Sequence, residues 1–496
     1  MPRAVLAIDQ GTTATTALVV GHDGSVLGRA TSEFTQYYPK PGWVEHDPEE
    51  IWRVSLEVAE RAVAAAGIEG AELAAVGITN QRETAVVWDR RSGRPVHRAL
   101  VWQSRQTAEI CERLRAAGHE SWVRESTGLV LDPYFSASKI RWILDHVPDG
   151  QRLAEAGELL FGTVDSWLLW KLTGGEVHAT EPTNASRTML YDIHRRRWAS
   201  ELLELFDVPR AMLPKVLPSA GVFGRTRKLG SLPAGIPVAG IAGDQQAALY
   251  GQACWRPGMV KATYGTGSFV VLHTGDTATR SEGGLVTTVC CDALGRPAYA
   301  LEGSIFTTGA AVQWLRDAMG LVETAAETET VGARVDDTMG VYVVPAFAGL
   351  GAPYWDMHAR GAVVGLTRGS GRDQIVRATL DSIAYQTRDV VDVMNRDSGV
   401  EISELRVDGG AAANNVLMQF QADILGIPVV RPVLVETTAA GAAFLAGLGA
   451  GFWRGPDEIE GSWRRERLFE PAMSAERRDE LYAGWRTAVR QVLTSR

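Results

Sequence analysis

The first thirty residues contain three short apolar runs separated by polar turns. The runs lie at residues 4–8, 16–20 and 25–30, and the turn at residues 9–13 combines an aspartate with glycine and threonine. Runs of this length between turn-forming residues predict three β-strands. A dinucleotide-binding fold would place a helix after its first turn. Consecutive strands therefore indicate another kind of α/β arrangement.

A helical spacing of apolar residues follows at residues 48–66. Apolar side chains recur there on one face, and Asp47 stands before Pro48 as an expected N-cap. An apolar strand is predicted at residues 73–78, and strands alternate with helices as far as residues 159–172. This alternation predicts a layered α/β domain.

The opening pattern returns past the middle of the chain. Residues 237–242 form an apolar run, and a Gly-Thr-Gly turn at residues 264–268 separates strand-like runs at 259–263 and 269–273. The combination of strand, glycine-threonine turn and strand thus occurs twice, which indicates two domains of related build. We expect these domains to be residues 1–250 and 251–496.

The rest of the second half predicts further helices and strands. We expect a long amphipathic helix at residues 372–397, a strand at 404–407, a helix at 412–425 and a short strand at 429–430. The charged segment from residue 460 onward is predicted to be helical and to pack on the outside.

Length and composition agree with two large globular domains. A chain of 496 residues with 45% apolar and 22% charged residues is too long for one core. Its net charge of −9 argues against a nucleic-acid partner. The most apolar stretch, residues 439–453, is too short to cross a bilayer, so no membrane insertion is expected. The four cysteines lack a CxxC spacing and no signal peptide precedes the first strand, so we expect reduced thiols and a cytoplasmic protein.

Two glycine- and threonine-rich turns are candidate phosphate sites, at residues 9–13 and 264–268. Glycine lets the backbone approach an anion, and backbone N–H groups and threonine hydroxyls donate hydrogen bonds to it. Asp9 can face a phosphate only with a cation between them, which implies Mg²⁺. Either turn alone would pass for an ordinary hairpin, but their occurrence at a strand end in both domains favours function.

Asp244 follows the apolar strand that ends at residue 242, where open α/β sheets place their chemistry. An aspartate at such a position accepts the hydroxyl proton in phosphoryl transfer to an alcohol. Capping of the following helix is an equally good use of the residue. The double-glycine turn at residues 408–414 allows a flat base or ribose to lie against the backbone, with Asn414 as a hydrogen-bonding partner, although packing alone explains such turns equally well.

Arg82 and Glu83 are candidates for binding neighbouring hydroxyl groups as donor and acceptor. Trp102 and Tyr134 would then supply an aromatic wall for the carbon face of the ligand. The alternative is a surface ion pair and two core aromatic residues, which is the commoner arrangement.

Taken together and in this order, the motifs resemble the FGGY family of carbohydrate kinases. The similar stretches are residues 38–48 (YPKPGWVEHDP), 78–84 (ITNQRET), 181–190 (EPTNASRTML) and 349–356 (GLGAPYWD). The resemblance implies an α/β fold of two actin/hexokinase-like (ribonuclease H-like) domains that face a central cleft and close over ATP and substrate. It also implies ATP-dependent phosphorylation, with glycerol favoured by the Asn-Gln-Arg-Glu string at residues 80–83.

The resemblance further implies roles for individual residues. Asp244 would be the general base, and Asp9 would organise Mg²⁺. The substrate residues would be Arg82, Glu83, Trp102, Tyr134, Asp244, Gln245 and Phe269. The ATP residues would be Thr12, Thr13, Ala14, Thr266, Gly309, Gln313, Gly410 and Asn414. A homodimer or homotetramer is expected.

Thr16 departs from the family pattern, which usually has arginine or lysine seven residues after the aspartate. Threonine can donate one hydrogen bond but cannot neutralise phosphate charge. A glycerol-sensing protein with weak catalysis therefore stays open. Independently of Thr16, a kinase of the same family for another small polyol or ketose is the nearest alternative. Residues 225–232 also differ from the loop that gives bacterial members sugar-bisphosphate inhibition, so we do not expect that feedback.

Overall fold

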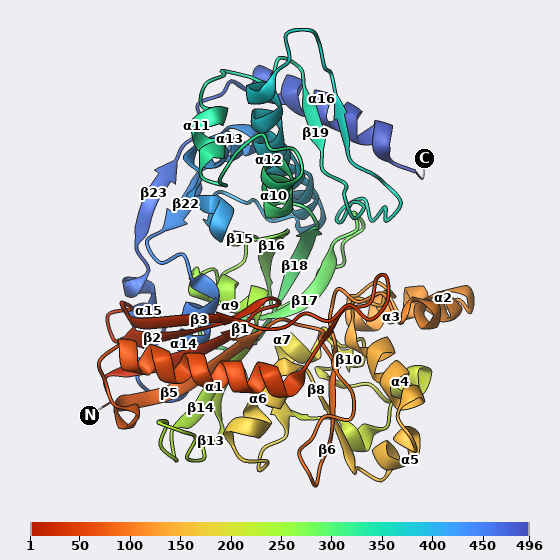
Figure 1. Ribbon diagram of the computed structural model, residues 1–496, viewed down its shortest axis with the longest axis vertical. Coiled ribbons are helices and arrows are strands. Elements are labelled where there is room, and N and C mark those ends of the chain that lie inside the picture. The colour runs from red at the N-terminus through yellow and green to blue at the C-terminus, as the bar shows by residue number, and fades with distance from the viewer. Residues whose placement is uncertain (1, 495–496) are drawn as a thin grey trace.

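The computed structural model describes residues 2–494, and its longer strands form two separate sheets, one above the other in Figure 1. The first sheet has the order β13-β14-β5-β1-β2-β3. Its strands are β1 (Ala4–Gln10), β2 (Ala14–Gly21), β3 (Val26–Glu33), β5 (Leu73–Asn80), β13 (Ala220–Arg225) and β14 (Pro237–Gly243). The second has the order β17-β18-β16-β15-β21-β22-β23. Its strands are β15 (Val260–Tyr264), β16 (Ser268–Gly275), β17 (Val286–Cys291), β18 (Pro297–Ile305), β21 (Leu405–Asp408), β22 (Val429–Pro432) and β23 (Arg465–Phe469).

The two sheets share one five-strand arrangement. In the first, β1, β2 and β3 form an antiparallel meander, and β5 and then β14 are added in parallel on the other side of β1. In the second, β15, β16 and β18 form the meander, and β21 and β22 are added in parallel beside β15. The repeat predicted from the two glycine-rich turns is therefore present in the strand order.

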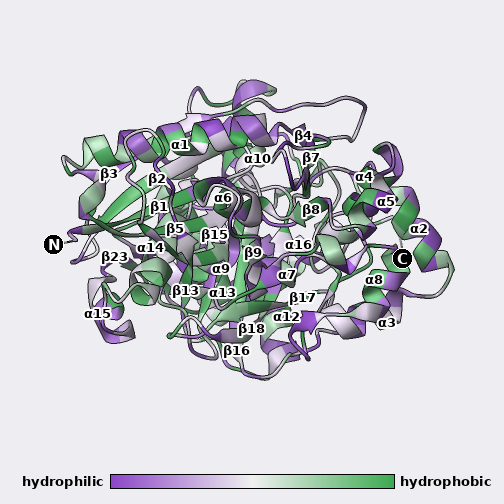
Figure 2. Cartoon of the chain, turned by 90° about the horizontal axis from the view of Figure 1, so that it is seen from below, coloured by the Kyte–Doolittle hydropathy of each residue, from purple (hydrophilic) through white to green (hydrophobic). Residues whose placement is uncertain are grey.

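Helices cover both faces of the first sheet. Helix α1 (Pro48–Ala65) and α6 (Val164–Leu172) pack on one face, and α9 (Asp244–Gly251) and α14 (Thr437–Gly449) on the other. The predicted N-cap of α1 is confirmed, because the Asp47 carboxylate accepts a hydrogen bond from Glu49 N at 2.9 Å. Figure 2 shows the expected alternation of hydrophobic and hydrophilic residues along α1.

The second sheet is covered by α12 (Arg372–Ser398), the long amphipathic helix predicted from the sequence. Helix α13 (Asn415–Leu425) packs beside it, and α16 (Ala475–Val492) lies outside both. Gly399 ends α12 in the left-handed conformation with φ 64°.

Helices α9 and α14 join the two halves of the chain. A Cβ atom on Gly441 would lie 1.8 Å from the Ala247 carbonyl oxygen, and one on Gly251 would lie 2.0 Å from that of Thr437. Only glycine allows the two backbones to approach this closely. Because α14 comes from the second half yet packs on β1, β5 and β14, the chain crosses between the sheets more than once. The domain boundary at residue 250 stays a prediction.

The remaining elements are short and lie outside the two large sheets. The helices are α2 (Ala108–Ala116), α3 (Glu120–Thr127), α4 (Ser136–His146), α5 (Gly150–Glu155), α7 (Pro182–Ala185), α8 (Ser200–Phe206), α10 (Gly309–Asp317), α11 (Glu327–Gly332) and α15 (Pro456–Ser462). The short 3₁₀ helices are η1 (Gly70–Glu72), η2 (Arg210–Met212) and η3 (Gly410–Ala413). The short strands are β4 (Glu45–His46), β6 (Val86–Asp89), β7 (Ala99–Leu100), β8 (Leu159–Gly162), β9 (Ala179–Thr180), β10 (Tyr191–Asp192), β11 (Arg197–Trp198), β12 (Lys215–Val216), β19 (Tyr342–Val344) and β20 (Ala362–Val364).

Three sequence predictions differ from the structure. The segment after residue 460 is not wholly helical, because β23 pairs with β22 as a charged edge strand. The helix expected at residues 412–425 starts at Asn415, after the η3 turn. Helix α9 starts at Asp244 with Gly243 as its N-cap, so Asp244 is not the N-cap residue, although its carboxylate accepts a hydrogen bond from Gln245 N at 2.7 Å in the first turn.

All four cysteines are buried free thiols, as expected. Burial raises the pKa of Cys111 to about 11 and that of Cys254 to about 12, which makes both thiols poor nucleophiles. Within residues 2–494, none of the helices combines the length and the apolar character needed to cross a membrane.

Candidate active site

Three neighbouring parallel strands of the first sheet end in polar residues. Asp9 lies near the end of β1, Arg82 and Glu83 follow β5, and Asp244 follows β14. The carboxyl ends of parallel strands meet at one edge of a sheet, which is where open α/β folds bind their ligands. The fold thus brings together residues that are more than 230 positions apart in the chain.

Asp244 is held by a buried arginine. Arg82 Nε lies 3.0 Å from Asp244 Oδ1, and the Arg82 side chain is 2% exposed while that of Asp244 is 27% exposed. The carboxylate is therefore the accessible end of an ion pair whose other end is fixed inside the protein. Arg82 and Glu83 are both buried, so they are not the surface pair considered as an alternative.

Arg82 is fixed by Glu302, which comes from β18 of the second sheet. Arg82 Nη1 lies 2.5 Å from Glu302 Oε2 and Arg82 Nη2 lies 3.0 Å from Glu302 Oε1. Arg187 donates to Glu302 Oε1 at 3.0 Å and to Glu83 Oε1 at 2.5 Å. Burial alone would raise the pKa of Glu302, but the guanidinium groups of Arg187 and Arg82 lower it to about 2. A buried ionic cluster therefore links the two sheets behind Asp244.

Two members of this cluster, Arg187 and Glu302, were not predicted from the sequence. Arg187 lies in the stretch at residues 181–190 that carries part of the family resemblance. Glu302 is a carboxylate in the middle of a strand whose other residues are apolar or small. A charge in a buried strand is the signal that would have identified it.

Aromatic side chains lie beside the ionic cluster. The Trp102 ring is 5.5 Å from the Tyr134 ring and 6.3 Å from the Phe269 ring, measured between centroids. Trp102 Nε1 donates a hydrogen bond to Thr12 Oγ1 at 2.9 Å, and the Arg82 guanidinium lies 5.7 Å from the Phe269 centroid. The predicted substrate residues and the first predicted phosphate turn are thus neighbours.

Asp9 carries an electrostatic strain. Desolvation and the nearby Asp244 carboxylate raise the pKa of Asp9 to about 7. A divalent cation between the carboxylates and a phosphate would relieve this strain, so the donor set fits Mg²⁺. No group of three or more His, Cys, Asp or Glu within residues 2–494 could hold a metal ion. Such an ion would depend on phosphate oxygens for most of its ligands.

Thr16 lies directly opposite Asp9 in the antiparallel pairing of β1 and β2. Residues that face each other in this way project on the same side of the sheet. The Thr16 hydroxyl is 3.0 Å from the hydroxyl of Thr31 on β3. The position where the family usually has a cation is thus beside Asp9 and is occupied by a neutral pair.

The second glycine-threonine turn is closed by a backbone hydrogen bond, as the first is, but it is one residue shorter. Gly265 N donates to Gly267 O at 2.9 Å, as Gly11 N does to Ala14 O at 3.0 Å. Helix α10 begins against this turn, because Gly309 N donates to Gly265 O at 2.9 Å.

Glycines bring the last segment of the predicted nucleotide site to the same turn. A Cβ atom on Gly409 would lie 2.5 Å from the Tyr264 carbonyl oxygen, and one on Gly309 would lie 2.6 Å from that of Gly265. Thr266, Gly309 and Gly410 are therefore gathered around one turn of the second sheet.

Other predicted nucleotide residues have structural tasks in the fold. Asn414 caps α13 by accepting from Leu417 N at 3.0 Å, and it donates to Thr328 Oγ1 at 3.2 Å. Gln313 is exposed on α10, and Thr13 is exposed in the first turn. Their roles toward a nucleotide stay predictions.

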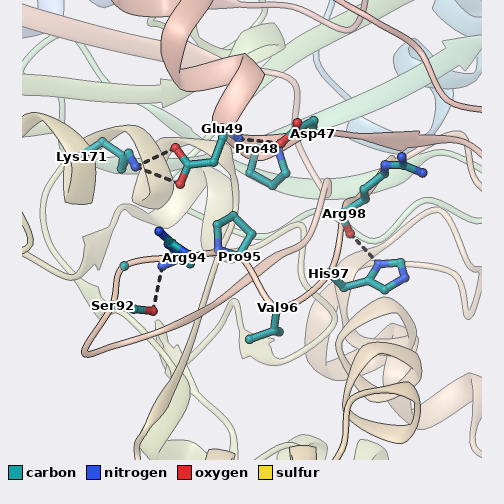
Figure 3. A pocket seen from close by; sticks show the side chains of 11 residues that line it. Asp47, Pro48, Glu49, Ser92, Arg94, Pro95, Val96, His97, Arg98 and Lys171 are labelled. Carbon is teal, nitrogen blue, oxygen red and sulfur yellow. Dashed lines mark hydrogen bonds and ion pairs between the residues drawn. The ribbon is translucent and has the colours of Figure 1, made fainter.

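A hollow of about 650 Å³ lies between the N-terminus of α1, residues 92–98 and α6 (Figure 3). Lys171 Nζ there lies 2.8 Å from Glu49 Oε2, so its charge is already matched. No predicted site residue among residues 2–494 lines this hollow. We assign it no function.

Fold and site together define a two-domain kinase that acts on a small hydroxylated substrate. Residues 4–251 match the N-terminal domain, and residues 260–450 the C-terminal domain, of the FGGY family of carbohydrate kinases. The chain belongs to this family.

Relatives with curated names are similar over nearly the whole chain. Glycerol kinase 2 of Thermotoga maritima is 57% identical over 489 residues, which are 99% of this chain and 98% of that protein. The glycerol kinase of Halorhodospira halophila is 58% identical over 489 residues, 99% of this chain and 96% of that protein.

Solved structures show the same arrangement. The crystal structure of Plasmodium falciparum glycerol kinase with ADP is similar with a TM-score of 0.92 and 34% identity, covering 99% of both chains. A xylulose kinase from Rhodospirillum rubrum, with a TM-score of 0.84 and 24% identity over 99% of both chains, shows the fold alone. The two sheet-based domains are those of an FGGY kinase.

Proposed function

We propose that this protein transfers the γ-phosphoryl group of ATP to glycerol, giving ADP and sn-glycerol 3-phosphate, with Asp244 as general base. One observation carries the proposal: a partly exposed Asp244 carboxylate, held 3.0 Å from a buried Arg82, beside an aromatic wall. The glycerol kinases of Thermotoga maritima and Halorhodospira halophila support glycerol as the substrate, and the Plasmodium falciparum structure with ADP supports an adenine nucleotide.

Glycerol has hydroxyl groups that need hydrogen-bonding partners and carbons that need apolar contact. Arg82 and Gln245 supply donors, Glu83 and Asp244 supply acceptors, and the Tyr134 hydroxyl can do either. Trp102 and Phe269 are assigned to the carbon face. The site therefore combines both kinds of surface that a small polyol requires.

Asp244 orients one terminal hydroxyl and accepts its proton as the oxygen attacks the γ-phosphorus. Phosphoryl transfer passes through a loose transition state, so positioning and charge stabilisation contribute more than base strength. The Arg82 guanidinium keeps the Asp244 carboxylate in place. Thr12, Thr13 and Ala14 are assigned to the transferred phosphoryl group, and Thr266, Gly309, Gln313, Gly410 and Asn414 to the rest of the nucleotide.

We assign Mg²⁺ to Asp9, together with the phosphate oxygens of the nucleotide. When bound, the ion would supply neutralisation of phosphate charge, which matters more here because Thr16 adds none. Asp9 would hold the ion near the first phosphate turn, and its pKa of about 7 favours the ionised form in slightly alkaline solution.

A cytoplasmic location and a homodimer or homotetramer belong to the same proposal. Four free, buried thiols support a reducing compartment. Size-exclusion chromatography with light scattering measures the assembly directly, and a monomer would contradict that part of the proposal.

The test of the reaction is ADP release by purified protein with Mg-ATP and a panel of acceptors. The panel contains glycerol, erythritol, dihydroxyacetone, a pentulose and no acceptor. We expect glycerol to give the highest kcat/KM. A higher value for another acceptor would move the assignment to a different polyol or ketose. Glycerol binding without turnover would favour the sensing function that Thr16 suggested.

A further inference from the structure

Lys261 is a buried lysine on β15 that no sequence motif identified. Its Nζ atom donates to Gln245 Oε1 at 2.5 Å, to Thr263 Oγ1 at 2.8 Å and to the Phe269 carbonyl oxygen at 3.4 Å. Two of these three partners, Gln245 and Phe269, are assigned to glycerol. Lys261 therefore holds two of the predicted substrate residues without being one of them.

An ammonium group has three donors and no acceptor. The carbonyl oxygen of the Gln245 amide must therefore face Lys261, and the NH₂ group is directed away from it. Within residues 2–494 no hydrogen bond to another residue engages Gln245 Nε2. Without the lysine, the Gln245 amide has no partner that distinguishes its oxygen from its nitrogen. The amide can then rotate and exchange the positions of these two atoms.

We propose that Lys261 fixes the polarity of Gln245, so that the site presents one amide donor next to the acceptor carboxylate of Asp244. The NH₂ group of Gln245 then donates a hydrogen bond to the oxygen of one glycerol hydroxyl, while Asp244 accepts the proton of the reacting hydroxyl. Lys261 is thus a positioning residue that sets which hydrogen bonds the site offers. This inference rests on the proposed function.

The charges around Lys261 agree with this role. Burial lowers the pKa of Lys261 to about 8, and the carboxylates of Asp408, Asp244 and Glu302 act against that shift. Lys261 lies beside the ionic cluster of Arg82, Arg187, Glu83, Glu302 and Asp244, and the Asp408 carboxylate adds a further negative charge near it. The carboxylates of Asp408, Asp244 and Glu302 therefore favour the ammonium form of Lys261, although the lysine is buried.

The test compares glycerol with propane-1,2-diol and propane-1,3-diol, each of which lacks one hydroxyl. The KM for glycerol and the competition constants of both diols are measured for the wild type and for Lys261→Met. We expect the KM for glycerol to rise about tenfold, because one hydrogen bond to the substrate is lost. For the diol that keeps the hydroxyl bound by Gln245, the competition constant should rise by the same factor. For the diol that lacks this hydroxyl, the competition constant should change by less than about threefold.

Two further variants separate positioning from folding. Lys261→Gln keeps a neutral donor for Gln245 Oε1 and should recover part of the lost affinity. Thr263→Val removes another partner of Lys261 and leaves Gln245 in place, so all three ligands should bind within about threefold of the wild type. If Lys261→Met does not fold, the same comparison is made with Lys261→Gln, whose smaller losses should still differ between the diols.

An equal weakening of glycerol and both diols would overturn the inference, because a structural role affects every ligand alike. Unchanged binding of all three would overturn it as well. Failure of the proposed function shows separately, as a wild-type protein without glycerol-dependent ADP release. In that case, calorimetric titration of glycerol and the diols applies the same comparison to binding alone.

Discussion

Replacing Glu302 by glutamine removes one charge from the ionic cluster behind Asp244 and almost no volume. Glu302 is fully buried and accepts three hydrogen bonds, two from Arg82 and one from Arg187. The variant leaves two buried guanidinium groups with Glu83 and Asp244 as their only carboxylate partners in the cluster. Removing one partner of a buried ion pair strongly destabilises the folded protein, because the other charge is left buried without full compensation.

The cost can be bounded in two ways. Breaking a buried ion pair by removing one partner costs about 3–5 kcal/mol. Independently, the pKa of Glu302 is about 2 in the folded chain against 4.5 in the unfolded chain, a difference that corresponds to about 3 kcal/mol. We therefore expect Glu302→Gln to lower the free energy of unfolding by about 3–5 kcal/mol at pH 7.

The pH dependence follows from the sign of the shift. A carboxylate with a lowered pKa contributes stability that is present above its unfolded pKa and is lost as the pH falls. The difference between wild type and Glu302→Gln should therefore be constant above pH 4.5 and shrink between pH 4.5 and about 2.

The assay is urea unfolding followed by tryptophan fluorescence, with Arg187→Met added to form a double-mutant cycle. In the double variant one unpaired cation is gone, so the loss should be about 1–3 kcal/mol smaller than the sum of the single losses. Glu460→Gln is the control, because the Arg256–Glu460 pair is exposed and should contribute less than about 1 kcal/mol. Equal, small losses for Glu302→Gln and Glu460→Gln would refute the reasoning, and so would strict additivity in the cycle.

Three further predictions concern the first turn and the helix crossing. Asp9→Asn should stabilise the ligand-free protein by up to about 4 kcal/mol above pH 7, because a carboxylate with a raised pKa costs stability as the pH rises from 3.8 to about 7; a lower melting temperature than the wild type at pH 8 would contradict this. Thr16→Arg should lower the KM for ATP by about tenfold, since the new cation lies opposite Asp9 on the same sheet face; an unchanged KM would show that the missing charge is of no consequence. Gly441→Ala should cost about 3 kcal/mol or more, because its Cβ atom would lie 1.8 Å from Ala247 O, whereas Gly461→Ala, with open space around it, should be neutral in the same melting experiment.

Local features of the fold could be predicted because they depend on residues close together in the chain. The Asp47 cap before Pro48 and the two glycine-threonine turns are set by side chains within a few positions of each other. Strand β23 was missed because its charged residues carry no alternation, and its pairing with β22 is a long-range contact. The start of α13 was placed three residues too early because alanines in the η3 turn have helical propensity.

The candidate site also contains residues that could be predicted from the local sequence and residues that depend on long-range contacts. Asp244 and Arg82 follow predicted strands, and the family resemblance pointed to both. Glu302, Arg187 and Lys261 act through partners that are up to 220 positions away, so neither periodicity nor motif spacing could reveal those partners, although the charge of Glu302 in a buried strand was a local signal. Their roles became visible only when the fold brought Glu302 to Arg82 and Arg187, and Lys261 to Gln245.

Glycerol-dependent ADP release by the wild type and by Asp244→Asn tests the central claim most directly. The asparagine keeps the shape of the side chain and an oxygen that can accept from Arg82, so the fold should be retained. The account predicts strong turnover for the wild type and a loss of about 100-fold or more for the variant, with glycerol binding still measurable. Turnover of the variant near the wild-type level would contradict Asp244 as the general base.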